Sequence, residues 1–148
     1  MAKTFPDPKC RLLDLQEMWT ALLDGNWNSL ALVPTDHAVF VQVAVDALLS
    51  AIQKTGVVIR VIDARGVDVP EGKRLVEALR ATVSEGMRAI VLVDSLIQSL
   101  SGVHLVSGVD TVVLVVHVGA INFESLISTI TMIGPDRIIG SVTAPPVR

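Results

Sequence analysis

The sequence predicts an α/β domain in which a mainly parallel sheet of about five strands has helices on both faces. Three features of the chain support this prediction. Short apolar runs rich in Val and Ile alternate with longer segments of helical periodicity. The chain is 51% hydrophobic and 18% charged, so much of the sheet should be covered on both sides. Gly56 and Gly86 stand where helix C-terminal caps belong, each before the next apolar run.

The alternation begins with a helix. In order, the expected segments are helix Lys9–Asp24, strand Ser29–Val33, helix His37–Lys54, strand Val57–Ile62, helix Glu71–Ser84, strand Arg88–Val93, helix Ser95–Val106, strand Thr111–Val118, helix Ile121–Ile133 and strand Arg137–Val142. The first helix carries Leu12, Leu15 and Trp19 at helical spacing, and Gly25 ends it. The first strand is a short apolar run that Pro34 closes.

The pattern of the second helical segment is ambiguous, because its alternating valines would also suit a strand. Its polar residues recur at steps of four, four and three, which places them on one narrow helical stripe: Gln42, Asp46, Ser50 and Gln53. The segment is therefore expected to be a nearly buried helix. The next strands follow the cap glycines, with helix Glu71–Ser84 between them.

Later segments carry clearer signals. Thr111–Val118 is the most continuous β-branched run and the best candidate for a central strand. The next helix places its apolar residues on one face and ends at Gly134. We expect one domain, with residues 1–28 as N-terminal helix and lead-in, 29–143 as the αβα core and 144–148 as an extended tail.

Composition excludes several classes of protein. Charged residues interrupt every apolar run before the roughly 18 residues that a membrane-spanning helix needs, so no span is expected. The N-terminus lacks a secretory signal, and the single Cys10 makes no disulfide framework, which favours the cytosol. A net charge of -3 with scattered Lys and Arg, and few aromatic residues, argues against nucleic acid as a partner.

Three carboxylates occupy the turns where a parallel sheet binds its ligands. Asp36 follows the first strand, Asp63 the second and Asp94 the third. Such a group could hold Mg²⁺ beside a phosphate. However, the turn from Val33 to Val39 has neither the glycines nor the lysine of a phosphate-binding loop. Asp36 in that turn would repel a polyphosphate.

The ends of the second and third strands read Val-Ile-Asp63-Ala-Arg-Gly and Val-Leu-Val-Asp94-Ser-Leu. With the order of segments, they resemble the deviant-Walker P-loop fold of MinD/ParA-type ATPases. The closest likeness is to the cytoplasmic domain of bacterial tyrosine kinases that govern polysaccharide chain length, and it covers about residues 27–143. The resemblance implies that Asp63 and Asp94 are metal-side carboxylates, and that Thr35, Asp36 and His37 replace the phosphate loop.

The departures from this family bear on function. The family's Gly-Lys-Ser/Thr is missing, and the chain has no tyrosine, so the C-terminal tyrosine cluster of such kinases cannot exist. The resemblance thus implies a P-loop relative without nucleotide chemistry and without a cofactor. It would act by binding another protein in polysaccharide synthesis or export. The partner would be a membrane-anchored chain-length regulator or a second copy, paired through faces that flank the nucleotide site.

Other interpretations remain open at this stage. Asp63 and Asp94 could be turn formers or helix N-caps, Asp36 could cap the next helix, and His37 could be solvated or a general base. A weak phosphotransferase or nucleotidase would use Asp63 and Asp94 to hold Mg²⁺ for a nucleotide. A receiver-like regulatory domain would share the sheet. This chain fits it poorly, because the sequence has no paired acids after the first strand and no lysine after the last.

Overall fold

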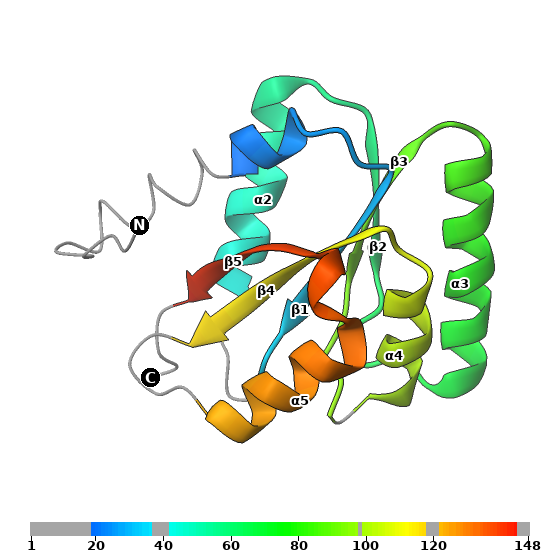
Figure 1. Cartoon of the computed structure of the whole chain (residues 1–148). Helices are drawn as coiled ribbons and strands as arrows, with labels where there is room; N and C mark the ends of the chain where they lie inside the picture. Colours follow the sequence, from blue (N-terminus) through cyan, green and yellow to red (C-terminus); the bar gives the residue numbers. More distant parts are fainter. Residues whose placement is uncertain (1–18, 37–41, 98, 118–121, 145–148) are drawn as a thin grey trace, which may run out of the picture.

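The computed structural model describes residues 19–36, 42–97, 99–117 and 122–144. Its elements are β1 (Ser29–Pro34), α2 (Gln42–Thr55), β2 (Ile59–Asp63), α3 (Val69–Ser84), β3 (Arg88–Leu92), α4 (Leu100–Ser107), β4 (Thr111–His117), α5 (Phe123–Ile133), the 3₁₀ turn η1 (Pro135–Arg137) and β5 (Ile138–Ala144) (Figure 1). Residues 19–23 are helical as well, while residues 9–18 of the predicted first helix lie outside the described residues. Of the predicted tail 144–148, Ala144 belongs to β5 and residues 145–148 lie outside the described residues.

The five strands form one sheet in the order β2-β3-β1-β4-β5, and each neighbouring pair is parallel. This confirms the predicted α/β architecture. The middle strand of the sheet is β1, whose six residues are all buried, and the predicted central strand β4 lies next to it. β4 lies inside the sheet between β1 and β5, and burial on both faces is what favours such a run.

Helices cover both faces of the sheet, and each face has its own core (Figure 1). Successive residues of β1 point to opposite sides: Leu30 and Leu32 pack with α2, whereas Ala31 and Val33 pack with the helices of the other face. That second layer consists of α3, α4 and α5. Alternate residues of one strand thus join both cores, which fixes the register of the sheet.

The helical segment 19–23 is anchored on the α2 face. Trp19 is fully buried, and its indole Nε1 donates a hydrogen bond to the carbonyl of Ala44 at 3.2 Å. The guanidinium of Arg88, on β3, donates to the carbonyl oxygens of Leu23 at 2.6 Å and Trp27 at 3.0 Å and lies 3.8 Å from the centre of the Trp27 ring. The apolar stripe of the first helix therefore packs on its own domain, as far as it is described.

Several element boundaries differ from the sequence prediction, among them three element starts. α3 begins at Val69 instead of Glu71, because Asp68 caps it: the Asp68 Oδ1 accepts a hydrogen bond from the Glu71 amide at 2.9 Å. α4 begins only at Leu100, and the last strand starts at Ile138, after the 3₁₀ turn. Within the parts of the chain that the structure describes, every helix is too short or too polar to cross a bilayer.

Candidate functional site

The predicted site residues lie at the carboxyl ends of three neighbouring strands. Asp63 ends β2 opposite Leu92 of β3, which in turn lies opposite Leu32 of β1. Asp94 therefore follows β3 just beyond Asp63, and Thr35 follows β1 at a similar height. The sheet order thus brings the predicted turns together at the carboxyl end of the sheet, while His37 lies outside the described residues.

Asp63 is paired with Arg65, two residues further along the chain. Arg65 Nε donates to Asp63 Oδ1 and Arg65 Nη2 to Asp63 Oδ2, both at 2.9 Å, and the Arg65 amide also reaches Oδ1 at 3.1 Å. The side-chain hydrogen bonds from Arg65 hold the pKa of Asp63 below its ordinary value, against a smaller opposing effect of burial. Both carboxylate oxygens of Asp63 are thus engaged within the chain.

Arg65 also connects β2 to the start of α2. Its Nη1 donates to Gln42 Oε1 at 3.0 Å, and Gln42 Nε2 donates to Asp46 Oδ1 at 2.8 Å. The hydrogen bonds to Asp63 raise the pKa of Arg65, and the charges of Asp63, Asp94 and Asp46 raise it further, while burial acts in the opposite direction. One guanidinium therefore serves as the shared counter-charge of three aspartates.

Asp94 is held by the backbone of the same loop. Its Oδ2 accepts a hydrogen bond from the Gly66 amide at 2.6 Å, and Gly66 has a φ of 74°, a conformation that other residues rarely adopt. Neither Asp63 nor Asp94 caps a helix, because Asp68 caps α3 and Ser99 caps α4. Asp63 does form a turn, since it accepts the amide of the residue two positions on.

Thr35 and Asp36 occupy the position at which the family resemblance implies the phosphate loop. Thr35 is buried, and both its amide and its Oγ1 donate to the carbonyl oxygen of Val115, at 3.1 and 3.3 Å. Its hydroxyl is therefore directed at the sheet. Asp36 is half-buried and adds a negative charge at the carboxyl end of the sheet.

These contacts limit the chemistry that the residues at the carboxyl end of the sheet can perform. Among the described residues, no three His, Cys, Asp or Glu side chains gather as a possible metal site. A pocket of about 440 Å³ lies beside the loop, lined by residues of the β2–α3 turn and of the first turn of α3, and Arg74 lies within 3.4 Å of Glu71 there. A metal role for Asp63 and Asp94, and a ligand role for Thr35, Asp36 and His37, stay predictions.

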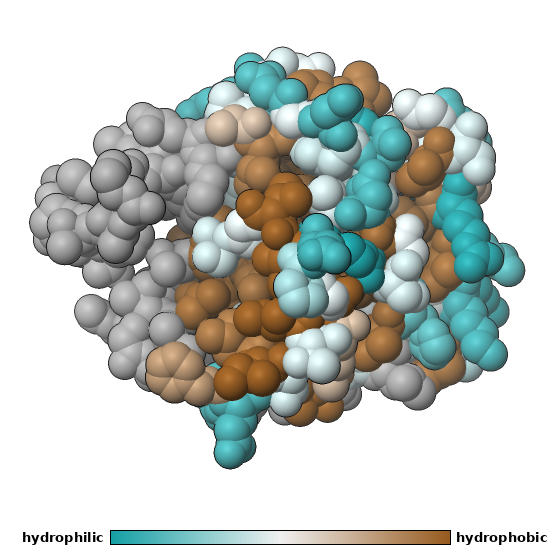
Figure 2. All heavy atoms as spheres, viewed as in Figure 1, coloured by the Kyte–Doolittle hydropathy of each residue, from teal (hydrophilic) through white to brown (hydrophobic). Residues whose placement is uncertain are grey.

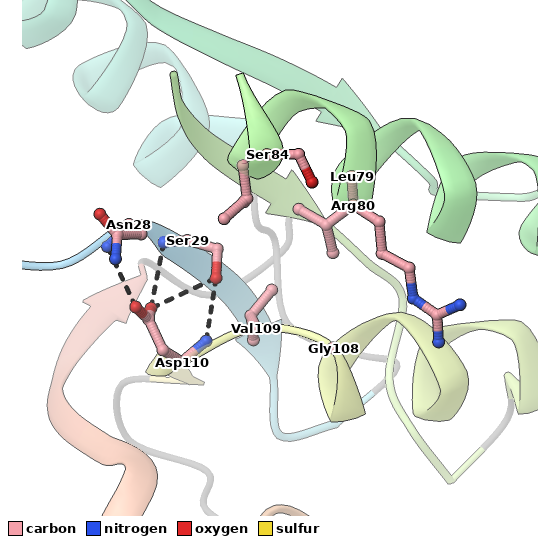
Figure 3. Close-up of a pocket in the computed structure, with 9 residues that line it drawn as sticks. Asn28, Ser29, Leu79, Arg80, Ser84, Gly108, Val109 and Asp110 are labelled. Carbon is pink, nitrogen blue, oxygen red and sulfur yellow. Dashed lines mark hydrogen bonds between the residues drawn. The ribbon is translucent and has the colours of Figure 1, made fainter. Parts of the chain in front are cut away.

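A pocket of about 480 Å³ lies at the amino end of the sheet, where β1 and β4 begin (Figure 3). The polar side of this pocket is formed by Asp110, whose carboxylate is hydrogen-bonded to the backbone of the chain. Asp110 accepts hydrogen bonds from the amides of Asn28 at 3.1 Å and Ser29 at 3.0 Å. Burial acts to raise the pKa of Asp110, but these amide hydrogen bonds, together with those from the hydroxyls of Thr111 and Ser29, lower it below its ordinary value. Arg80 extends from α3 across the pocket (Figure 3).

The sequence did not predict the role of Arg65, although the strand-end motif contains it. An Asp-x-Arg spacing directly after a strand was the signal: a turn there brings the two side chains together. The polar stripe of α2 was recognised from its spacing, yet the pairing of Gln42 and Asp46 with the β2 loop depends on the sheet order.

No protein-family model matches the chain, and a search of curated proteins finds no match. Among solved structures, the kinase domain of the Escherichia coli tyrosine kinase ETK is similar, with a TM-score of 0.70 and 10% sequence identity. The match covers 93% of this chain and 76% of that one. At this identity the likeness shows the fold, and it confirms the resemblance inferred from the strand ends. The chain has the α/β fold of a bacterial tyrosine kinase domain.

Proposed function

We propose that the chain is a non-catalytic P-loop-like protein that acts in the cytosol by binding another protein. The observation that carries this proposal is the double hydrogen bond between Arg65 and Asp63. A carboxylate that holds Mg²⁺ or its water needs oxygen lone pairs free for the ion. Here a guanidinium donates to both oxygens of Asp63, so it uses part of their lone pairs and its positive charge opposes a cation at the same carboxylate, and the Gly66 amide donates to Asp94 Oδ2.

The turn after β1 supports the same conclusion. A triphosphate is held by bare amides and a lysine at a helix N-terminus. The described part of this turn offers a buried hydroxyl that is bonded to the sheet, followed by the negative Asp36. Neither group compensates phosphate charge, so the proposal includes no nucleotide and no metal cofactor.

We place this function in bacterial polysaccharide synthesis or export. The support is the sequence resemblance together with the structural likeness to a tyrosine kinase domain. A chain without tyrosine cannot be phosphorylated in the way that such kinases are, so a binding role fits better than a kinase role. The partner under this proposal is a membrane-anchored chain-length regulator or a second copy of the chain.

Calorimetric titration with ATP and Mg²⁺ tests the non-nucleotide part. We expect no binding heat up to millimolar ATP. A dissociation constant in the micromolar range would contradict the proposal. Metal-dependent hydrolysis that disappears in Asp63→Asn and Asp94→Asn, and persists in the control Asp136→Asn on the distant turn η1, would favour the phosphotransferase alternative.

Genetic complementation tests the role in the pathway. Deleting the gene in its native host is expected to change the amount or length of the secreted polysaccharide. A copy with Asp63→Asn should restore the polymer, because a binding protein needs no metal-side carboxylate. An unchanged polymer after deletion would exclude the pathway, and failure of a folded Asp63→Asn copy to complement would indicate catalysis.

A further inference from the structure

The sheet has two edge strands, β2 and β5, and they differ in charge. β2 carries the exposed Arg60 and Asp63, and charged side chains on an edge discourage pairing with another chain. β5 reads Ile-Ile-Gly-Ser-Val-Thr-Ala and has no charged residue. Within the described residues, β5 pairs with β4 alone, so its outer edge offers backbone donors and acceptors without this protection.

The middle of β5 is also poorly covered by the helix layers. Ile139 is 45% exposed, and Gly140 and Ser141 are exposed too. Gly140 lies opposite Val113, which belongs to the α2-side core, and Ser141 lies opposite Leu114, which belongs to the other core. Because the two residues point to opposite faces, neither layer of helices covers this part of the strand.

An apolar flank of α5 adjoins the same edge. Phe123 is 68% and Ile127 62% exposed, and their spacing of four places them on one side of the helix. In a right-handed β4–α5–β5 crossover, that side faces the β5 edge, whereas the exposed Met132 lies on the side of α4. The surface over α5 and β5 is largely hydrophobic (Figure 2), and α5 carries one charge, Glu124.

We infer that the outer edge of β5 and the Phe123–Ile127 flank of α5 form the interface of a homodimer, in which β5 pairs antiparallel with β5 of a second copy. The two five-stranded sheets then become one continuous sheet. This inference rests on the proposed binding function and names its partner. The surface differs from the faces beside the nucleotide position that the family resemblance implied.

Symmetry favours a second copy over an unrelated partner. A twofold interface must be complementary to itself, and a strand edge meets this condition when it pairs antiparallel with its own copy. The twofold axis that pairs the strands is perpendicular to the sheet, so it keeps both α5 helices on one face. Their Phe123–Ile127 flanks then face each other, and the uncharged strands bring no like charges together at the centre.

The molar mass of the full chain in solution, measured by sedimentation velocity without nucleotide, tests the inference. We expect the parent protein to sediment as a dimer at micromolar concentration. Ile139→Lys and Phe123→Asp should sediment as monomers with unchanged circular dichroism. The matched control is Val58→Lys: Val58 is 72% exposed and precedes the opposite edge strand, so this variant should stay dimeric. Deuterium exchange of the β5 amides should be slow in the dimers and fast in the monomers.

Three results would overturn the inference. A monomeric parent would do so, including one whose β5 amides exchange slowly at every concentration, since a segment of the same chain would then cover the edge. Dimers that persist in both Ile139→Lys and Phe123→Asp would place the interface elsewhere. Equal dissociation of Val58→Lys would mean that any added lysine weakens the dimer. Since no nucleotide is present, each result is independent of the ATP titration.

Discussion

Arg65 lowers the pKa of Asp63 at the carboxyl end of the sheet. Arg65→Met keeps the aliphatic stem and removes the guanidinium, so the pKa of Asp63 should rise towards its ordinary value of about 3.9. Side-chain carbon shifts in an NMR titration report this pKa directly. The control Arg74→Met removes an exposed cation of α3 and should leave the Asp63 titration unchanged. An unchanged pKa in Arg65→Met would mean that the ion pair is absent in solution.

The same ion pair makes the free energy of unfolding depend on pH. The pKa of Asp63 is lower in the folded than in the unfolded chain, so the pair stabilises the fold above the unfolded-state pKa of about 3.9. The contribution is lost as pH falls through the lower, folded-state pKa. Because Asp63 is 53% exposed, Arg65→Met should cost at most about 1 kcal/mol at pH 7. Urea titrations should show this difference shrinking below about pH 4, and a difference independent of pH would contradict the account.

Arg88 connects the N-terminal helical segment to β3. It donates to three backbone carbonyls, those of Leu23, Gly25 and Trp27, and stacks on the Trp27 ring. Arg88→Met should lower the free energy of unfolding by about 2 kcal/mol, because these acceptors lose a charged donor. Urea denaturation measures the change. Arg80→Met, which removes an exposed cation from α3, is the control and should differ from the parent by less than about 0.5 kcal/mol.

The positions of Asp63 and Asp94 could be predicted because a polar residue directly after an apolar run marks a strand end. Their partners could not. The contacts of Asp63 with Arg65, and of Asp94 with Gly66, depend on the path of one loop between two neighbouring strands. Asp110 gave no signal either, since its donors come from residues that precede it by about 80 positions in the chain.

α3 and α4 pack closely at Gly72. A Cβ at this position would lie 2.8 Å from the Cβ and 3.0 Å from the Oγ of Ser101. Gly72→Ala should therefore destabilise the fold by about 1–3 kcal/mol, although alanine favours a helix more than glycine does. Thermal unfolding measures this effect. Combining Gly72→Ala with Ser101→Gly should restore part of the loss, and purely additive effects would show that the two helices do not meet there.

Helix ends were easier to predict than helix starts. Glycine marks several ends by its conformation, as Gly86 does with a φ of 80°. The start of α3 has a readable signal, Asp68 followed three residues later by Glu71, which the apolar periodicity alone does not reveal. The start of α4 was misplaced because the loop before it is apolar: Leu96 is buried in the core although it lies outside the helix.

A dimer built on β5 would couple association to stability for the protein as a whole. Binding that occurs only between folded chains raises the unfolding temperature with protein concentration. The parent protein should therefore show a higher Tm at higher concentration, and Phe123→Asp should show none of this dependence. Differential scanning calorimetry at two concentrations tests the expectation. A concentration-independent Tm for the parent would contradict it.

The alternation of segments predicted the parallel sheet and its two helix layers, but not the strand order. Every parallel order of five strands has the same local pattern of apolar runs and helices. The order β2-β3-β1-β4-β5 depends instead on which helices cover which face, and the two cores record that choice. The strand order also decides that β5 is an edge, a property that its own seven residues do not encode.

The central place of β1 has a consequence for folding during synthesis. β1 pairs with residues 89–92 of β3 and with residues 111–115 of β4. At about 5–20 residues per second, the ribosome needs roughly 4–16 s after making β1 before its second neighbour exists. For most of that interval this uncharged hexapeptide, apolar except for Ser29, has no strand to pair with. The nascent chain should therefore depend on a holdase chaperone more than its modest length would suggest.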